Sequence, residues 1–292
     1  MTKAASPSSP PPADFFSSLG WAGFSLLGSG HKQESLPNQD RVFAAVSWMG
    51  ENDRVLFALC DGHGQEGHLC AEFLLEHLTS GLIELGYERN RGQALQAFCR
   101  REDRAIEQTY RTGGTTFVLA DISPKDIFLA HVGDSRATAL CSHGPYTLTK
   151  DHDANHISTR EKEAIHRRGG IVLSTTDGKQ QRVVSLDIKT AQGLAIYRSL
   201  GDRPYGRGPS PDPDLRTVAW ATLTPYRHLV LWSDGAWYLC KDFYTPSLSL
   251  GRLLGSSDAS DMALRLRQHI VDRFPDDDAT AMVIDLSAFR PS

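Results

Sequence analysis

The sequence predicts an α+β fold in which strand hairpins and paired helices form the layers of one domain. Three observations lead to this prediction. Short apolar runs separated by turn residues recur along the chain, as in strand hairpins. Between positions 68 and 106 apolar residues repeat every three or four places, which indicates two helices in succession. No strand pattern separates these helices, and this argues against a repeating βαβ unit.

The first elements expected along the chain are a hairpin and the two helices. The runs "RVFAAVSW" (41–48) and "RVLFALC" (54–60) flank the turn-rich "MGEND" and predict the hairpin. Residues 68–85 form the first helix, and Gly86 closes it as a C-cap. The second helix has Leu95, Phe98, Cys99, Glu102 and Ile106 on one side, which is apolar except for Glu102.

Further strands are expected in the middle and at the end of the chain. "TTFVLADI" (115–122) and "IFLAHVGDSRATAL" (127–140) have strand patterns and are joined by a short turn. "RHLVLWSDG" (227–235) indicates a buried strand, and "ATAMVIDL" (279–286) closes the fold. The segment 257–273 between these two strands shows helical periodicity.

A surface flap is expected around residues 150–195. It contains a short helix over residues 158–168, because Ser158 and Glu161 have the spacing of a capping box. Residues 171–193 are polar and lack a regular pattern, so an irregular segment is predicted there.

Length and composition are those of a globular protein with a sizeable core. The chain has 292 residues, of which 40% are hydrophobic. Residues 1–20 are rich in Ser and Pro and lack the apolar core of a signal peptide, so a disordered tail is expected. Residues 21–292 should then form a single domain that includes the flap.

Charge and cysteine content narrow the range of partners. A net charge of −4, with no Lys/Arg run longer than two residues, gives no support for nucleic-acid binding. No apolar run approaches the length of a membrane span. The five cysteines include no Cys-x-x-Cys pair, and none is followed six residues later by Arg. We therefore expect an intracellular protein of a reducing compartment, cytoplasm or nucleus, that binds neither membrane nor nucleic acid and is a monomer.

Aspartates stand at the ends of the predicted strands. They are Asp40, Asp61, Asp134, Asp234 and Asp277. A single aspartate at such a place is commonly a turn former. Several that converge at one end of a sheet core would repel one another unless multivalent cations neutralised them. Oxygen ligands without a Cys/His cluster favour Mg²⁺ or Mn²⁺ over Zn²⁺, so the sequence predicts a divalent metal site.

Ten short motifs resemble, in order, those of the type 2C family of metal-dependent Ser/Thr protein phosphatases. They extend over roughly residues 21–286 and are "PNQDR" (37–41), "DGHG" (61–64), "GGTT" (113–116), "AHVGDSRA" (130–137), "LTKDH" (148–152), "EAIHRRGGIV" (163–172), "LAIYRSLGD" (194–202), "PDPDLR" (211–216), "LWSDGAW" (231–237) and "DDDATAMVI" (276–284). The resemblance implies a four-layer αββα sandwich: two antiparallel sheets flanked by antiparallel helix pairs, with a two-metal site at one end.

The resemblance also implies roles for individual residues. Asp61 should bridge two Mg²⁺ or Mn²⁺ ions, and the carbonyl of Gly62 should bind one of them. Asp234 and Asp277 should complete the ligands of the other ion. Asp40 should act through metal-bound water.

Two further assignments follow from the motifs. Asp277, rather than Asp276 or Asp278, matches the first acid of the family's Asp-Asn/Asp-x-Ser/Thr ending. Asp134, together with Asp234, is a candidate ligand for a third ion.

The chemistry that the resemblance implies is hydrolysis of phosphoserine and phosphothreonine in proteins, so phosphorylated proteins are the expected partners. Two metals about 3.5–4 Å apart can activate a bridging water and clamp the phosphate for in-line attack. His63 is the predicted general acid, because imidazole titrates near physiological pH and can protonate the alkoxide leaving group. The chain would then be a phosphoric monoester hydrolase.

Some positions depart from the family pattern. Ser35 stands where the family often has a phosphate-binding Arg, so Lys32 and Arg41 are the candidate substitutes. Tyr238 stands where many relatives have Asp, which puts the third ion in doubt. These departures motivate an alternative, a catalytically weak member that binds phosphoproteins as a scaffold.

Two smaller questions stay open at this point. Gly62, Gly64 and Gly67 have the G-x-G-x-x-G spacing of a dinucleotide-binding turn. An oxidoreductase is a remote alternative, however, because the charge of Asp61 would repel a pyrophosphate. In "YRSLGD", Arg198 and Asp202 could form a buried ion pair that braces the flap, or could contact substrate.

Overall fold

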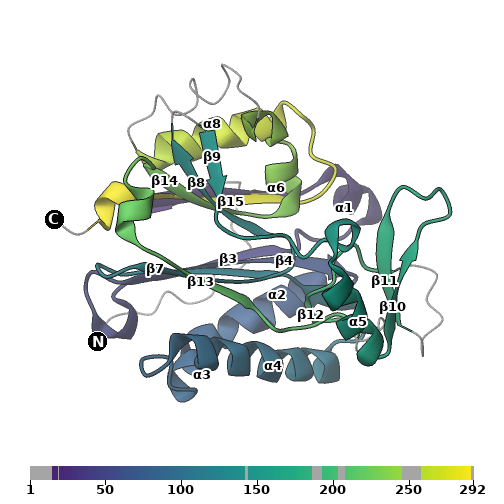
Figure 1. The fold of residues 1–292 in the computed structure, drawn as a ribbon. Coiled ribbons are helices and arrows are strands. Elements are labelled where there is room, and N and C mark those ends of the chain that lie inside the picture. The colour runs from purple at the N-terminus through teal and green to yellow at the C-terminus, as the bar shows by residue number, and fades with distance from the viewer. Residues whose placement is uncertain are drawn as a thin grey trace.

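The computed structural model describes residues 15–18, 20–141, 144–185, 193–202, 208–244 and 258–290. Two antiparallel β-sheets lie face to face, and helices cover the outer face of each sheet (Figure 1). The predicted αββα sandwich is therefore confirmed.

Each sheet is assembled from strands that are distant in sequence. The first has the order β1 (Phe16–Ser18), β2 (Trp21–Leu26), β15 (Ala279–Asp285), β14 (His228–Trp232), β8 (Arg136–Cys141) and β9 (Gly144–Thr147). The second has the order β12 (Leu200–Gly201), β5 (Gly113–Thr115), β4 (Val55–Gly64), β6 (Phe117–Ile122), β7 (Ile127–Val132) and β13 (Asp214–Val218), with β3 (Asp40–Ala45) paired to β4. The hairpin predicted from residues 41–48 and 54–60 is the antiparallel pair of β3 and β4.

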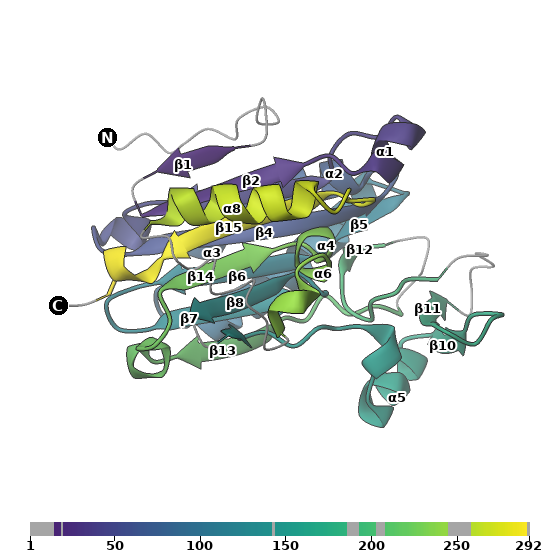
Figure 2. The same cartoon turned by 90° about the horizontal axis from the view of Figure 1, so that it is seen from above.

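Helices form the outer layers. The second sheet is covered by α2 (Gly67–Glu76), α3 (Leu78–Glu84) and α4 (Arg91–Thr109). The first sheet is covered by α8 (Ala259–Val271), which lies along β2 and β15 (Figure 2), and by the short α6 (Asp234–Tyr238). Within the described residues the remaining helices are α1 (Ser29–Glu34), α5 (Thr159–Arg167) and the short 3₁₀ turns Trp48–Gly50, Ala154–His156, Trp220–Leu223, Lys241–Tyr244 and Leu286–Ala288.

Strand β4 shows why its sequence is continuously apolar. Successive side chains of a strand point to opposite faces. Leu56, Ala58 and Cys60 pack under the helices α2–α4. The alternate residues of the same strand, which include Phe57 and Leu59, pack between the two sheets. Because both faces of β4 are buried, apolar residues are favoured at every position of the strand.

Two predicted elements differ in detail from the structure. The helix predicted over residues 68–85 is interrupted at His77, which separates α2 from α3. The strand run predicted over residues 127–140 is divided between the two sheets, with β7 in one and β8 in the other. The chain crosses at Gly133, whose φ of 101° lies in a region that glycine adopts without strain.

The flap contains regular structure where an irregular segment was expected. Helix α5 begins as predicted, with the Ser158 hydroxyl accepting from the Glu161 N–H. It is followed by a hairpin of β10 (Gly170–Ser174) and β11 (Gln181–Ser185). Residues 186–192 of the expected irregular stretch lie outside the described residues.

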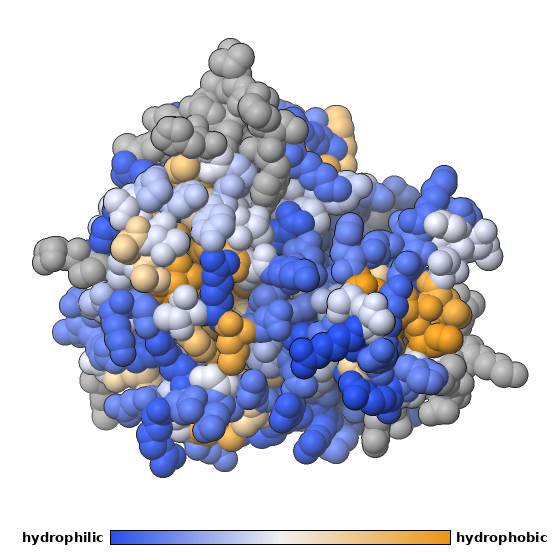
Figure 3. Space-filling view, in the orientation of Figure 1, coloured by the Kyte–Doolittle hydropathy of each residue, from blue (hydrophilic) through white to orange (hydrophobic). Residues whose placement is uncertain are grey.

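Hydrophobic side chains gather on the surface of the flap (Figure 3). The flap also has a shallow hollow of about 550 Å³ that is open to solvent and lined by Lys162, Glu163, His166, Arg167, Ile171 and Val172. The flap thus exposes basic and apolar side chains side by side.

The N-terminal segment differs from the expected disordered tail at its end. Residues Phe16–Ser18 form β1, which pairs with β2, and the ring of Phe16 lies 5.9 Å from that of Trp21. Packing of the Phe16 ring against the neighbouring strand stabilises this short edge strand. Residues 1–14 of the predicted tail lie outside the described residues. No helix in the described ranges has both the length and the apolar composition needed to cross a membrane.

Candidate metal centre

The two sheets bring their aspartates to one end of the sandwich. Asp40 on β3 is directly opposite Asp61 on β4. Asp234 follows β14, and Asp277 precedes β15, which pairs with β14. Asp134 lies in the turn between β7 and β8. We call these five residues the acidic cluster.

Mutual repulsion shows that the members of the acidic cluster are close in space. Burial raises the pKa of Asp61 well above its ordinary value, and the charges of the other four members raise it further. The pKa of Asp134 is likewise raised by burial and then by Asp234. Burial and Asp277 raise the pKa of Asp234 to about 6. Such a cluster binds either protons or cations.

Asp40 is held in place by Ser233. The Ser233 hydroxyl donates to Oδ2 of Asp40 at 2.8 Å, and it accepts from the backbone N–H of Thr280 at 3.0 Å. Oδ1 of Asp40 is buried and has no hydrogen-bond partner within the described part of the chain. A buried carboxylate oxygen without a donor fits a site that takes a cation or an ordered water.

The raised pKa values give the metal-free protein a defined pH dependence. Burial, then Asp278, raises the pKa of Asp40 from 3.8 to about 8. Between these values the folded state holds more protons than the unfolded state, so stability falls as the pH rises. We expect EDTA-treated protein to melt at a lower temperature near pH 8 than near pH 6, by on the order of 2–4 °C per kcal/mol lost. Mn²⁺ should reduce the difference, and a higher Tm near pH 8 without metal would contradict the prediction.

Of the three consecutive acids before β15, Asp278 is buried and hydrogen-bonded, whereas Asp277 is exposed. Asp278 is buried and accepts from the N–H groups of Gly28 (2.8 Å) and Gln39 (2.6 Å). Its Oδ2 also lies 2.8 Å from Nδ1 of His31. Asp278 thus anchors the segment around α1. Asp277 is exposed, with Oδ1 accepting from the N–H of Asp278, so its other oxygen is the one free to serve as a ligand.

The glycines of the "DGHGQEG" stretch allow close backbone packing. A side chain on Gly62 would collide with the backbone of Gly67, and one on Gly67 would lie 2.6 Å from the carbonyl carbon of Gly62. A side chain on Gly113 would lie 2.7 Å from the backbone nitrogen of Gly67. The start of α2 is therefore covered by neighbouring backbone, which leaves no room for a pyrophosphate. Both sheets are antiparallel, whereas a dinucleotide-binding fold has a mostly parallel sheet, so the dinucleotide-binding alternative is excluded.

His63 is paired with an acid that the sequence did not connect to it. Nε2 of His63 lies 2.8 and 2.9 Å from the two carboxylate oxygens of Asp202. Burial lowers the pKa of His63, but the carboxylate of Asp202 outweighs that effect and the pKa is raised. The side chain of His63 is 27% exposed, so its ring can be reached from solvent.

Arg198 and Asp202 do not form the ion pair that was one of the two expectations. Arg198 instead donates to Oδ1 of Asp214 at 2.8 Å and to Oε1 of Glu161 on α5 at 2.9 Å. Its guanidinium also donates to the carbonyl of Asp212. The expected Arg198–Asp202 pair is therefore wrong, and Arg198 contacts the flap through Glu161 instead.

The two candidate phosphate-binding cations have different surroundings. Arg41 donates to the carbonyls of Asn38 and Asp40, at 2.7 and 2.9 Å, and lies 3.6 Å from Glu72. These contacts tie down the strand that carries Asp40. Lys32 is exposed on α1. A role in phosphate binding remains a prediction for both.

Tyr238, which replaces an acid of the family pattern, is 58% exposed. Lys241 places its ammonium 3.1 Å from the centre of the Tyr238 ring. The neighbouring Trp237 donates from Nε1 to the carbonyl of Asp134. The side chain at position 238 therefore offers an aromatic face and no carboxylate to a third ion.

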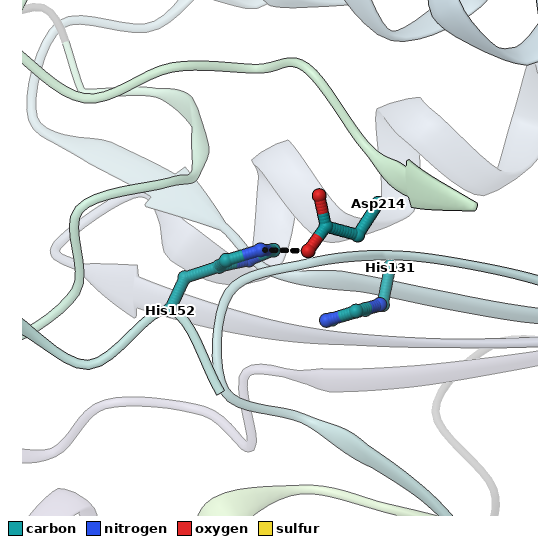
Figure 4. Close-up of side chains that lie close together, drawn as sticks. All are labelled: His131, His152 and Asp214. Carbon is teal, nitrogen blue, oxygen red and sulfur yellow. Dashed lines mark hydrogen bonds and ion pairs between the residues drawn. The ribbon is translucent and has the colours of Figure 1, made fainter. Parts of the chain in front are cut away.

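Outside the acidic cluster, a second group has the composition of a metal site. Ligand atoms of His131, His152 and Asp214 lie within 4.8 Å of one another (Figure 4). In the described ranges no three carboxylates of the acidic cluster lie as close together as this. The two imidazole rings are stacked, with centroids 4.7 Å apart. Burial, then His152, lowers the pKa of His131 to about 4.

The Nε2 atoms of both histidines in this trio carry protons that are used in hydrogen bonds. Nδ1 of His152 accepts from the N–H of Gly133, so its proton is on Nε2, which lies 3.2 Å from Oδ2 of Asp214. Nε2 of His131 lies 2.8 Å from the carbonyl of Lys150 and must donate to it. A nitrogen that carries a proton has no lone pair for a metal. The trio is therefore a structural network beneath the Asp134 turn.

A sequence profile of the family described as "Protein phosphatase 2C" matches residues 28–272. This chain belongs to the protein phosphatase 2C family. It is 32% identical over 197 residues to human "Probable protein phosphatase 1N", covering 62% of this chain and 42% of that relative. It is 28% identical over 256 residues to "Probable protein phosphatase 2C 62" of Oryza sativa subsp. japonica, covering 85% of this chain and 81% of that relative.

Solved structures show the same fold. A serine-threonine phosphatase 2C from Toxoplasma gondii superposes with a TM-score of 0.71 at 19% identity, covering 94% of this chain and 98% of that chain. The catalytic domain of serine threonine protein phosphatase PstP, in complex with 2 manganese ions, superposes with a TM-score of 0.56 at 20% identity, covering 91% of this chain and 96% of that chain. These two-sheet domains confirm the fold class that the sequence predicted.

Proposed function

We propose that this protein hydrolyses phosphoserine and phosphothreonine esters in proteins with the help of divalent metal ions. The observation that carries the proposal is the acidic cluster, in which aspartates from both sheets meet and raise one another's pKa values. Membership of the protein phosphatase 2C family supports the proposal. So does the manganese-bound PstP domain, which shares the fold.

The residues of the cluster fit Mg²⁺ or Mn²⁺. Asp61 and the carbonyl of Gly62 would hold one ion, and Asp61 would share a second with Asp234 and Asp277. Asp40 would contact the ions indirectly, through an ordered water that donates a hydrogen bond to its Oδ1, which has no other partner within the described residues. When bound, two such ions supply an activated water and positive charge for the phosphoryl oxygens.

His63 is the residue we assign to the leaving group. A serine or threonine alkoxide is a poor leaving group unless it is protonated as the P–O bond breaks. His63 lies two residues from Asp61 on the same strand, and its ring is partly open to solvent. His63 therefore lies beside the acidic cluster and can donate a proton to the leaving-group oxygen.

Location and assembly are also proposals. The five cysteines are free and buried, as suits a protein of a reducing compartment. We propose an intracellular monomer that acts on phosphorylated proteins.

Removal of divalent ions tests the proposed activity. We expect the protein to hydrolyse p-nitrophenyl phosphate and a phosphothreonine peptide with Mn²⁺, and to lose at least about 90% of both activities in excess EDTA. Added Mn²⁺ or Mg²⁺ should restore turnover. Phosphopeptide binding without turnover under any divalent ion would favour the scaffold alternative, and EDTA-resistant turnover would contradict the metal requirement.

A further inference from the structure

Asp202 has no task in the function proposed so far, yet it is a fully buried carboxylate. Its backbone φ is 64°, in the left-handed region that few residues other than Gly, Asn and Asp enter. Its own N–H donates to the carbonyl of Gly113 at 3.1 Å. The preceding Gly201 is held in turn by Asp103 of α4, which accepts its N–H at 2.8 Å. The backbone around Asp202 is thus fixed on both sides.

The sheet places Asp202 across one strand from His63. Gly114 on β5 is directly opposite His63 on β4 and directly opposite Gly201 on β12. Asp202, one residue beyond Gly201, turns back over Gly114 towards His63. The acid and the imidazole therefore come from the two strands that flank β5.

Gly114 makes this approach possible. A side chain at position 114 would place its Cβ 2.5 Å from Cγ, Oδ1 and Oδ2 of Asp202. The space that any other residue would fill is occupied by the carboxylate, whose two oxygens lie 2.8 and 2.9 Å from Nε2 of His63. The contact is built into the sheet and does not depend on a mobile surface side chain.

We propose that Asp202 is a positioning residue for the phosphatase reaction, which holds the His63 ring by Nε2 and so directs Nδ1 towards the leaving-group oxygen. This inference rests on the proposed function. Nδ1 has no hydrogen bond within the described part of the chain, so it is the ring nitrogen left for substrate.

The proposed step balances in bonds and protons. The oxygen of the attacking water forms the new P–O bond, and the ester P–O bond breaks with its electron pair going to the serine or threonine oxygen. The serine or threonine oxygen takes the proton from Nδ1 of His63, and the proton that the water loses returns to Nδ1 through solvent before the next turnover. A carboxylate on the far nitrogen keeps an imidazole in the orientation that transfer requires, as the aspartate does in serine-protease triads.

Kinetics of Asp202→Asn test the inference, because the amide keeps the size of the side chain. We expect kcat for a phosphothreonine peptide to fall by about 10–100-fold, since general acid catalysis contributes about 10²–10⁴-fold. KM should stay within about threefold. Turnover of p-nitrophenyl phosphate, whose leaving group needs little protonation, should fall by less than about threefold.

A double-mutant cycle with His63→Ala separates positioning from a general effect on folding. Once His63 is absent, Asp202→Asn should cause no further loss with the peptide. Equal losses with both substrates, or losses that multiply with those of His63→Ala, would overturn the inference. If the wild-type protein hydrolyses neither substrate with Mn²⁺, the proposed function itself fails.

A spectroscopic measurement tests the contact independently of turnover. In metal-free protein with ¹⁵N-labelled histidine, the His63 ring is identified by the signal that His63→Ala removes. Its Nε2–H should be protected from exchange in the wild-type protein, and Asp202→Asn should shift the ring ¹⁵N resonances. A rapidly exchanging Nε2–H in the wild-type protein, or an unshifted ring in the variant, would overturn the inference.

Discussion

Replacement of Asp61 by Asn should lower kcat/KM by on the order of 10³-fold or more, equivalent to about 4 kcal/mol of transition-state stabilisation. Asp61 lies at the centre of the acidic cluster, because the charges of all four other members act on it. An amide keeps an oxygen in nearly the same place but supplies no negative charge, so it should weaken the binding of both ions. The measurement is Mn²⁺-dependent hydrolysis of p-nitrophenyl phosphate and a phosphothreonine peptide.

Stability measurements distinguish this loss from unfolding. Because the pKa of Asp61 is raised by like charges, removal of its charge relieves repulsion in the metal-free protein. Asp61→Asn should therefore melt in EDTA at the same temperature as the wild type or a higher one. Asp177→Asn, in the exposed turn of the flap hairpin, is the matched control and should keep both activity and Tm. A variant of Asp61 that retains metal-dependent turnover within tenfold would refute the assignment.

The core strands were predictable because their apolar sequences match their burial in the folded protein. Residues 55–60 are apolar throughout, residues 279–286 are apolar except for Thr280 and Asp285, and both strands are buried on both faces. The division of residues 127–140 between two sheets was missed because the strand patterns on either side of the break are similar. Gly133 and the polar residues Asp134, Ser135 and Arg136 interrupt the apolar pattern at the crossing point, and the positive φ of Gly133 explains why glycine is there.

The candidate metal centre could be predicted in outline for a related reason. Strand ends that share a core must meet at an edge, so aspartates at those ends predict a cluster even without coordinates. The partner of His63 could not be found in this way. Asp202 is 139 residues away in sequence, and the contact depends on the order of three strands and on the bare backbone of Gly114 between them. Ser233, which fixes Asp40 from 193 residues away, was missed for the same reason.

A second large effect is expected far from the acidic cluster, in a polar network under the helices. Asp121 is completely buried on β6 and accepts from Nε and Nη2 of Arg54 at 2.8 and 2.6 Å. It also accepts from the hydroxyl of the fully buried Tyr87 at 2.9 Å. Asp121→Ala leaves the phenol without its acceptor and the buried guanidinium with the half-exposed Glu51, whose Oε1 lies 2.8 Å from Nη1. We expect the free energy of unfolding to fall by about 3–5 kcal/mol, because removal of the buried partner leaves most of a buried charge uncompensated.

Thermal and denaturant unfolding measure this loss, with Tm expected to fall by on the order of 10 °C. Asp53→Ala, in the exposed turn beside Arg54, is the matched control and should change stability by less than about 0.5 kcal/mol. Replacing both partners, as Arg54→Met with Asp121→Leu, should cost less than Asp121→Ala alone, since no charge is then left buried. If the double replacement is as destabilising as the single one, the loss comes from packing around Tyr87 and not from the unpaired guanidinium.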